Sequence, residues 1–277
     1  MLERATGSER SARRLGVVAV WVATFAWAWG YILVKWSSLD GLHFAMFRLW
    51  TGAAISCIAL LGTRRRLTRA AFRACALGGV FFAADIGLGF SAIKHTTIAD
   101  VAVIGALAPV AIGSSGSPSW SPFGDLLAVC GIGTWSAYWF FSRHVRERAD
   151  PIVYFACVML AAALVMTPTA FLLAGVPSWP TARDWFAIVG VALVPGFVGH
   201  TLVIWSHRHV ESWLSALITQ CSPVVTVTLA WILLGESLPA LAIAGGAIVI
   251  VATGVVLVAA ARRDGRADLD EAAERVS

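Results

Sequence analysis

Long apolar runs separated by short polar or charged stretches make up most of the chain. Many of these runs approach the ~20 residues that a helix needs to cross the hydrocarbon core of a bilayer. The expected helical segments are residues 15–36, 42–62, 70–93, 98–113, 124–142, 151–174, 185–205, 213–234 and 239–261. The pattern therefore predicts an all-α, polytopic membrane protein embedded in the lipid bilayer.

Two parts of the chain repeat one another. The offset that places Pro109 on Pro223 also places Ile104 on Ile218. Two copies of one helical unit in an apolar chain are typical of a transporter built from pseudo-symmetric repeats. Beyond the shared proline the second copy adds another helix, whereas the first copy ends near residue 113. We therefore expect two helical repeats, with four helices in the first and five in the second.

The expected organisation follows from these segments. It consists of a cytoplasmic N-terminal tail (1–14), a shortened first repeat (15–113), a Ser/Gly/Pro linker (114–123), a second repeat (124–261) and a charged C-terminal tail (262–277).

Composition excludes a soluble globular protein, because the chain is 58% hydrophobic and only 13% charged, with a mean hydropathy of +0.78. The net charge of +5 comes with arginines gathered in short clusters between apolar runs, as the positive-inside rule produces. Membrane topology explains this charge, so no nucleic-acid partner is expected. The five cysteines share no CxxC spacing, and we expect neither a disulfide framework, nor a metal site, nor a cofactor.

The arginine clusters also bear on the number of crossings. If every segment crosses and the N-terminus is cytoplasmic, the arginines at 143, 146 and 148 fall on the outer side, against the rule. A cytoplasmic position for them requires that one crossing is lost or replaced. Segment 98–113 is the candidate, because a helix of about 16 residues is only ~24 Å long.

Several stretches carry a resemblance to a known family. They are Trp29-Gly30, AIKHTTIADVAVIGALAPV (92–110), GDLLAVCGIGTWSAYWFFSR (124–143), GHTLVIWSHRHVES (199–212) and SPVVTVTLAWILLGE (222–236). In order and spacing they resemble the EamA-like branch of the drug/metabolite transporter superfamily. The resemblance implies ten helices in two inverted five-helix repeats, and this chain then lacks the fifth helix of the first repeat. It also implies a multi-pass protein of the bacterial plasma membrane.

Two functions remain open. One is a secondary carrier of a small organic metabolite or drug, and the resemblance implies an exporter. No GxxxxGK[ST] motif occurs, so we expect coupling to protons or exchange instead of ATP. The other is a degenerate, non-transporting membrane protein of the same fold, because rocking of one repeat against the other presumes two complete repeats. An enzyme is not expected, since neither HExxH nor GxSxG occurs.

Asp85 is the most informative residue, because it is a lone carboxylate within an apolar segment. Such a group costs several kcal/mol unless it is protonated, paired or facing water. Under the repeat offset it falls beside His200, whose side chain type titrates near neutral pH. We expect both to face a central cavity and to bind substrate or a coupling proton. The alternative is structural, with Asp85 bonding a neighbouring helix and His200 donating to a backbone carbonyl.

Other aromatic and polar residues complete the predicted substrate site. They are Trp29, Trp135, Tyr138 and Gln220. Aromatic walls suit organic substrates, although packing is the common alternative for all four. Pro109 and Pro223 each remove an intrahelical hydrogen bond, which predicts a kink in each repeat.

Three further features have mainly structural interpretations. Arg48 is expected to snorkel toward the headgroups, with pairing to an acidic residue as the alternative. Glu236 is expected to cap segment 239–261. Small residues about four apart in Ala244 to Gly254 favour close helix packing, either within the bundle or with a second copy in a homodimer.

Overall fold

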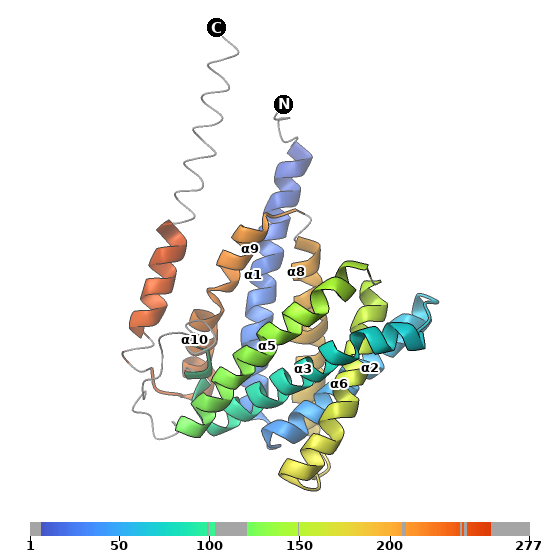
Figure 1. Ribbon diagram of the computed structural model, residues 1–277. Helices are drawn as coiled ribbons and strands as arrows, with labels where there is room; N and C mark the ends of the chain where they lie inside the picture. Colours follow the sequence, from blue (N-terminus) through green and yellow to red (C-terminus); the bar gives the residue numbers. More distant parts are fainter. Residues whose placement is uncertain are drawn as a thin grey trace.

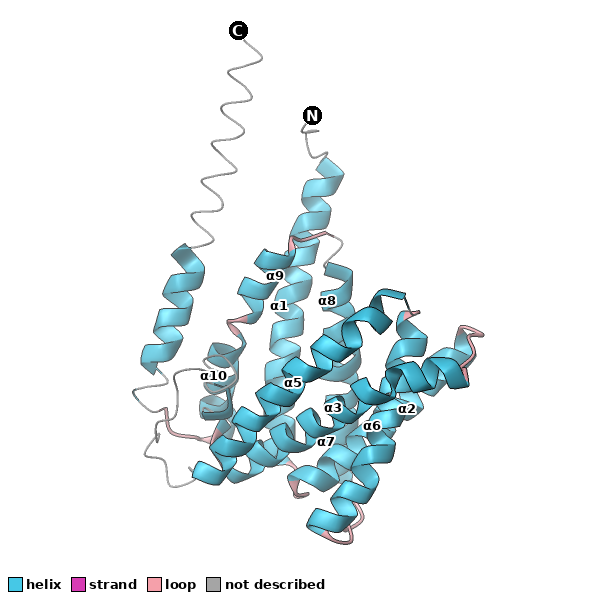
Figure 2. Ribbon diagram, in the orientation of Figure 1, coloured by secondary structure: helices cyan, strands magenta, loops and turns pink. Residues whose placement is uncertain are grey.

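A computed structural model provides the structure of the chain (Figure 1). It describes residues 7–98, 100–102, 121–148, 150–206, 209–238, 240 and 243–255. Pro109 and most of the expected linker, residues 114–120, lie outside the described residues, as does the expected tail 262–277. The described residues form helices and loops without any strand (Figure 2).

The helices keep the order of the apolar runs. Their bounds are α1 (Gly7–Trp36), α2 (Gly41–Gly62), α3 (Arg69–His95), α5 (Pro122–Arg148), α6 (Pro151–Ala174), α7 (Ala182–Val191), the π-helix η1 (Ala192–Gly199), α8 (His200–Ser206), α9 (Ser212–Thr219) and α10 (Ser222–Leu234). A further apolar helix covers Ile243–Val255.

Polar residues at the ends of the apolar runs fix where these helices begin. The Asp40 carboxylate accepts hydrogen bonds from the backbone of Leu42 and His43 at the start of α2. Asp150 caps α6 in the same way, and Thr181 forms a capping box with Asp184 at the start of α7. Each cap satisfies backbone N–H groups that a first turn leaves without intrahelical partners.

The described helices include six that are long and apolar enough to cross a membrane. They are Ser11–Trp36, Gly41–Gly62, Arg69–His95, Ile152–Ala174, Ala182–Val203 and Leu217–Leu234. A helix satisfies its backbone hydrogen bonds internally, which a hydrocarbon environment requires. The prediction of an all-α, polytopic membrane fold is confirmed. The division into repeats of four and five helices stays a prediction.

One end of the bundle, which we call the arginine-rich end, joins distant parts of the chain through ion pairs. Arg13 near the start of α1 pairs with Glu211 at the start of α9, with 3.3 Å between nitrogen and oxygen. Arg65 in the loop after α2 pairs with Asp150, which precedes α6. The loops at this end therefore lie on one side of the bundle.

The opposite end, which we call the far end, brings together the last turn of α1 and the first turn of α7. The Asp184 carboxylate accepts hydrogen bonds from the Ser37 hydroxyl at 2.7 Å and from the Ser38 backbone N–H at 2.7 Å. His43 Nε2 lies 3.1 Å from the carbonyl of Gly175, which follows α6. These contacts place the starts of α2 and α7 and the end of α6 together.

The chain leaves α3 and enters α5 at the same place, which is the far end. Ser121 N donates to Thr96 Oγ1 at 3.4 Å, and Thr96 Oγ1 donates to the Asp125 carboxylate at 3.1 Å. From there α5 runs back alongside α3 toward Asp150 at the arginine-rich end (Figure 1). Arginines 143, 146 and 148 thus belong to the end of α5 that adjoins Arg65. The loss or replacement of one crossing stays a prediction, because residues 103–113 lie outside the described residues.

The helices do not pack simply in chain order. α1 packs against α7, η1, α8, α9 and α10, whereas α5 packs along α3. The largest core lies between α2, α3, α5 and α6 and includes Phe82, Met159 and Met166. Within it α3 approaches α6 closely, since a Cβ built on Gly79 would lie 2.5 Å from Cβ of Ala161. The first half of the chain therefore contacts the second half along most of its length.

Two expected segments of the second half are interrupted. Segment 185–205 is helical throughout but widens into η1 around Pro195, which has no N–H to donate. Segment 213–234 is broken at Gln220 and Cys221, and Pro223 stands in the first turn of α10. The structure therefore has a break just before Pro223, where the sequence predicts a kink within one helix.

Candidate functional site

Charged and polar side chains of α1, α2 and α3 interact within the bundle. Asp85 of α3 interacts electrostatically with Arg48 of α2 and with Tyr31 of α1. Asp85 and Tyr31 are half-buried, so part of each side chain keeps an open surface. Because its partners come from two other helices, the Asp85 carboxylate faces the interior of the bundle rather than lipid. We call Tyr31, Arg48, Asp85 and His200 the central cluster.

Arg48 is the most deeply buried charge of this cluster, with only 5% of its surface exposed. Its guanidinium lies 5.6 Å from the ring centroid of Phe82, and Nη1 lies 3.7 Å from Sδ of Met159. Arg48 is thus enclosed by α3 and α6. The expectation that it snorkels toward the headgroups is wrong, because the neighbouring helices cover the whole side chain.

Backbone of η1 completes the surroundings of Arg48. A Cβ built on Gly196 would lie 3.3 Å from Arg48 Nη2, so the absence of a side chain there lets the guanidinium approach the helix. His200, one turn further along, also interacts electrostatically with Arg48. The cluster therefore joins the first half of the chain to the second.

Pro195 anchors the His200 side of the cluster. Its carbonyl accepts a hydrogen bond from Trp27 Nε1 at 3.2 Å and lies 2.9 Å from Nδ1 of His200. The rings of Trp27 and His200 meet edge to face, with 5.5 Å between centroids. His200 thus has the backbone partner that its structural interpretation expects, and it also interacts electrostatically with Arg48. Its role in binding substrate or a proton stays a prediction.

The tryptophan beside the cluster is Trp27, not the predicted Trp29. Two residues on a helix differ by about 200° in direction, and Trp29 is 39% exposed. Trp27 and Tyr31 are four residues apart and share the inner face of α1. The assignment of Trp29 to the substrate site stays a prediction.

Trp135 and Tyr138 lie on α5 and contribute to the packing against α3 and α6. Their rings stack with 5.4 Å between centroids, and Tyr138 also contacts Phe82 at 5.2 Å. Tyr154 of α6 donates a hydrogen bond from its hydroxyl to that of Tyr138 at 3.0 Å. Gln220, in contrast, is exposed at the break between α9 and α10. Tyr138 is connected to the central cluster through Phe82, whose ring lies beside Arg48. The roles of Trp135, Tyr138 and Gln220 in substrate binding stay predictions.

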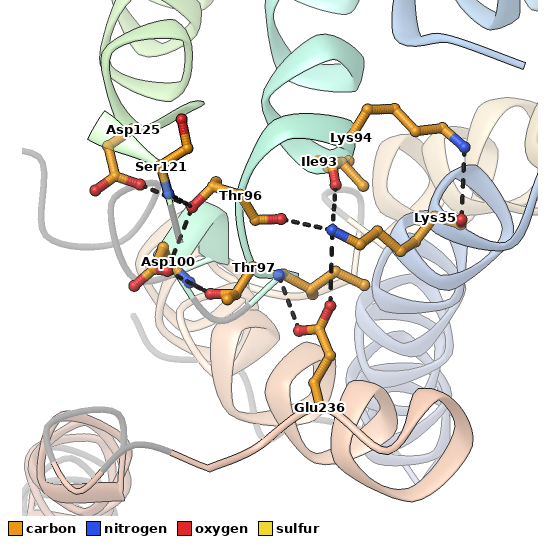
Figure 3. Close-up of polar contacts among 10 residues, drawn as sticks. Lys35, Ile93, Lys94, Thr96, Thr97, Asp100, Ser121, Asp125 and Glu236 are labelled. Atoms are coloured by element: carbon orange, nitrogen blue, oxygen red, sulfur yellow. Dashed lines mark hydrogen bonds and ion pairs between the residues drawn. The ribbon is translucent and has the colours of Figure 1, made fainter. Parts of the chain in front are cut away.

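A second cluster of polar side chains lies at the far end, near the point where the chain leaves α3 (Figure 3). Lys35, in the last turn of α1, donates to the carbonyl of Ile93 at 2.8 Å and to that of Thr96 at 2.6 Å. Its ammonium lies 3.8 Å from the carboxylate of Glu236, which follows α10. Lys94 Nζ donates to the carbonyl of Ser37 at 2.5 Å.

Glu236 connects three parts of the chain. Besides Lys35, its carboxylate accepts a hydrogen bond from the backbone N–H of Ile98 at 3.0 Å (Figure 3). It therefore caps the turn that begins at Ile98. The expected cap of segment 239–261 stays a prediction, because residues 239, 241 and 242 lie outside the described residues. We call Lys35, Thr96, Ile98 and Glu236 the far-end network.

Sequence inspection missed Arg48, Tyr31 and Trp27 as site residues. Arg48 is the one Lys, Arg, Asp or Glu in Gly41–Gly62, so the signal that identified Asp85 applies equally to it. Trp27 carries no such signal, because it is one of 13 tryptophans in the chain. For both Trp27 and Tyr31, the direction in which the side chain points depends on how α1 packs. Among the described residues, no three His, Cys, Asp or Glu side chains are grouped as a metal site requires.

The second half of the chain matches a known family. Residues 122–258 match the model of the EamA-like transporter family. This half of the chain belongs to the EamA-like transporter family. EamA-like proteins are membrane transporters of the drug/metabolite superfamily and not enzymes, and the helices described above make this EamA-like protein a multi-pass membrane protein.

Other comparisons extend the fold over more of the EamA-like chain. A solved structure described as "Crystal structure of protein" matches with a TM-score of 0.59 and 20% identity, over 89% of this chain and 97% of that one. At this identity the match supports the fold alone. No curated protein matches the sequence.

Proposed function

We propose that the protein is a secondary carrier that exports a small organic metabolite or drug across the bacterial plasma membrane, driven by protons or by exchange. The observation that carries this proposal is the central cluster. Charged groups deep within membrane helices are expensive and mark substrate or proton pathways. Here Asp85, Arg48 and His200 come from α3, α2 and α8, which belong to both halves of the chain.

Aromatic side chains beside the cluster suit an organic substrate. Trp27 and Tyr31 of α1 are both half-buried next to His200 and Asp85. Their rings provide apolar contact area, and their faces attract cationic groups. Asp85 is the proposed acceptor for a coupling proton or a cationic group of the substrate, and His200 is the proposed second titratable group.

The far-end network supports a carrier mechanism. It joins α1 and α3 of the first half to the end of α10 through Lys35 and Glu236. Alternating access requires contacts of this kind that close one end of the site and break when it opens. We propose that the described state is closed at the far end.

The test is transport in proteoliposomes that contain the purified protein. Uptake of a panel of radiolabelled amino acids, organic acids and amines is measured with and without a pH gradient. For any compound that moves, Asp85→Asn should abolish the response to the gradient, because the amide cannot carry the proton. Glu211→Gln, which alters an exposed acid at the arginine-rich end, serves as the matched control.

Two results would contradict the proposal. An Asp85→Asn protein whose uptake still responds fully to the pH gradient refutes the coupling role of Asp85. Absence of movement for every compound, with folded protein in the vesicles, favours the degenerate, non-transporting member of the family instead.

A further inference from the structure

The guanidinium of Arg48 is buried without the partners that a buried charge requires. Its Nε has no hydrogen-bond partner among the described residues, and its one hydrogen bond there is the 3.7 Å contact from Nη1 to a thioether sulfur. An arginine carries five N–H donors, and a buried charge is strongly destabilising unless it is paired. Most of the hydrogen-bonding capacity of Arg48 is therefore unused.

The nearby acid does not satisfy this charge directly. Asp85 interacts electrostatically with Arg48, yet the two form no ion pair within 4.0 Å. The described ion pairs are all at the two ends of the bundle, at Arg13, Lys35, His43 and Arg65. Arg48 thus has a counter-charge at a distance and unused donors close by.

Arg48 itself is buried, but polar residues around it keep part of their surface open. Gly196 presents no side chain toward Nη2. Asp85 and His200, which both interact with Arg48, and Tyr31, which interacts with Asp85, each retain an open surface although they lie within the bundle. A planar guanidinium with free donors matches the two oxygens of a carboxylate or phosphate group.

We propose that Arg48 binds the anionic group, a carboxylate or a phosphate, of the molecule that the carrier moves. This inference rests on the proposed function. An anion on Arg48 supplies the oxygen acceptors that the helices do not, and it neutralises the buried charge. A negatively charged Asp85 competes with the anion for Arg48, whereas a protonated Asp85 does not.

Competition between Asp85 and the anion for Arg48 predicts how substitutions change anion affinity. Asp85→Asn should bind anions about tenfold more tightly than the wild type, because a unit charge several ångströms away at partial burial contributes an interaction of that size. Arg48→Gln should no longer bind the anion. A merely structural Arg48 that only balances Asp85 predicts neither effect.

The experiment measures thermal unfolding of the full chain in phosphatidylcholine nanodiscs. Sodium acetate and sodium phosphate are titrated against sodium chloride at equal ionic strength, for the wild type, Arg48→Gln, Arg48→Lys, Asp85→Asn and the exposed-arginine control Arg73→Gln. At concentrations well above the dissociation constant, the bound anion should raise the unfolding temperature of the wild type and Arg73→Gln by about 3 °C. Arg48→Lys should retain part of the shift, since it keeps the charge without the planar fork.

The titrations with different salts and lipids distinguish the possible sources of the anion. A shift with acetate alone assigns a carboxylate, and a shift with phosphate assigns a phosphate group. A shift that appears only when phosphatidylglycerol is added to the nanodiscs means that Arg48 binds a lipid headgroup, and it overturns the proposal. If Arg48→Gln fails to fold, the charge-balanced double variant Arg48→Gln/Asp85→Asn takes its place, and an anion response equal to that of the wild type again overturns the proposal.

Failure of this inference is distinguishable from failure of the proposed function. Binding that depends on Arg48, together with no movement of any compound in vesicles, supports the anion site and refutes the carrier. Movement that Arg48→Gln leaves unchanged, with no anion shift in the wild type, supports the carrier and refutes the anion site.

Discussion

Removal of the Glu236 carboxylate tests the far-end network directly. In Glu236→Ala the backbone N–H of Ile98 loses its acceptor at 3.0 Å, and Lys35 loses its ion-pair partner at 3.8 Å. A lost helix-cap interaction costs about 1 kcal/mol. The ion pair is largely shielded, with side-chain exposures of 22% and 13%, and contributes about 1 kcal/mol.

The expected loss is therefore about 2 kcal/mol, or roughly 5 °C in unfolding temperature for a chain of this size. Lys35 keeps its bonds to the carbonyls of Ile93 and Thr96, which limits the loss to this range. Glu236→Gln retains a carbonyl acceptor for Ile98 and removes only the charge, so its loss should be about half as large.

Scanning fluorimetry of the purified variants in nanodiscs provides the measurement. Glu211→Gln is the matched control, because its ion pair with Arg13 has exposures of 50% and 47% and should contribute less than about 0.5 kcal/mol. Equal losses for the alanine and glutamine variants would refute the capping role of Glu236. Losses no larger than that of Glu211→Gln would refute the network as a whole.

Two further substitutions test how the helices are held. Asp184→Asn should destabilise the protein by about 3 kcal/mol in the same assay. The reason is that an amide nitrogen replaces one of the two carboxylate oxygens that accept hydrogen bonds from Ser37, Ser38 and Thr181. A loss of stability below about 1 kcal/mol contradicts this role of Asp184. Gly79→Ala should cost about 2 kcal/mol, since its Cβ would meet α6, whereas Gly89→Ala on the same helix meets nothing within 4 Å and should be neutral or stabilising.

The helices of this protein were predictable from the sequence because a membrane helix depends mainly on a run of apolar residues. The predicted segment 42–62 and the observed α2 differ by one residue at the start. The interruptions were not predicted in their observed form. Pro195 widens its helix into η1, and the break at Gln220 precedes Pro223, because the details depend on packing against α1.

The candidate site was only partly predictable. Asp85 and His200 lie in the central cluster as expected from their charge, although their roles remain proposals. Arg48 was misinterpreted because a long side chain reaches either headgroups or interior, and the sequence does not say which. The partner of Glu236 was inaccessible to sequence patterns, since Ile98 precedes it by more than a hundred positions and the contact exists only in three dimensions.

The meeting of Thr96 with Ser121 has a consequence for how related chains can differ in length. The chain departs and returns at a single point of the bundle, held there by Thr96 and Asp125. Insertions or deletions between these two positions leave the direction of α5 unchanged, provided that the junction survives. Every helix after it keeps its orientation as well.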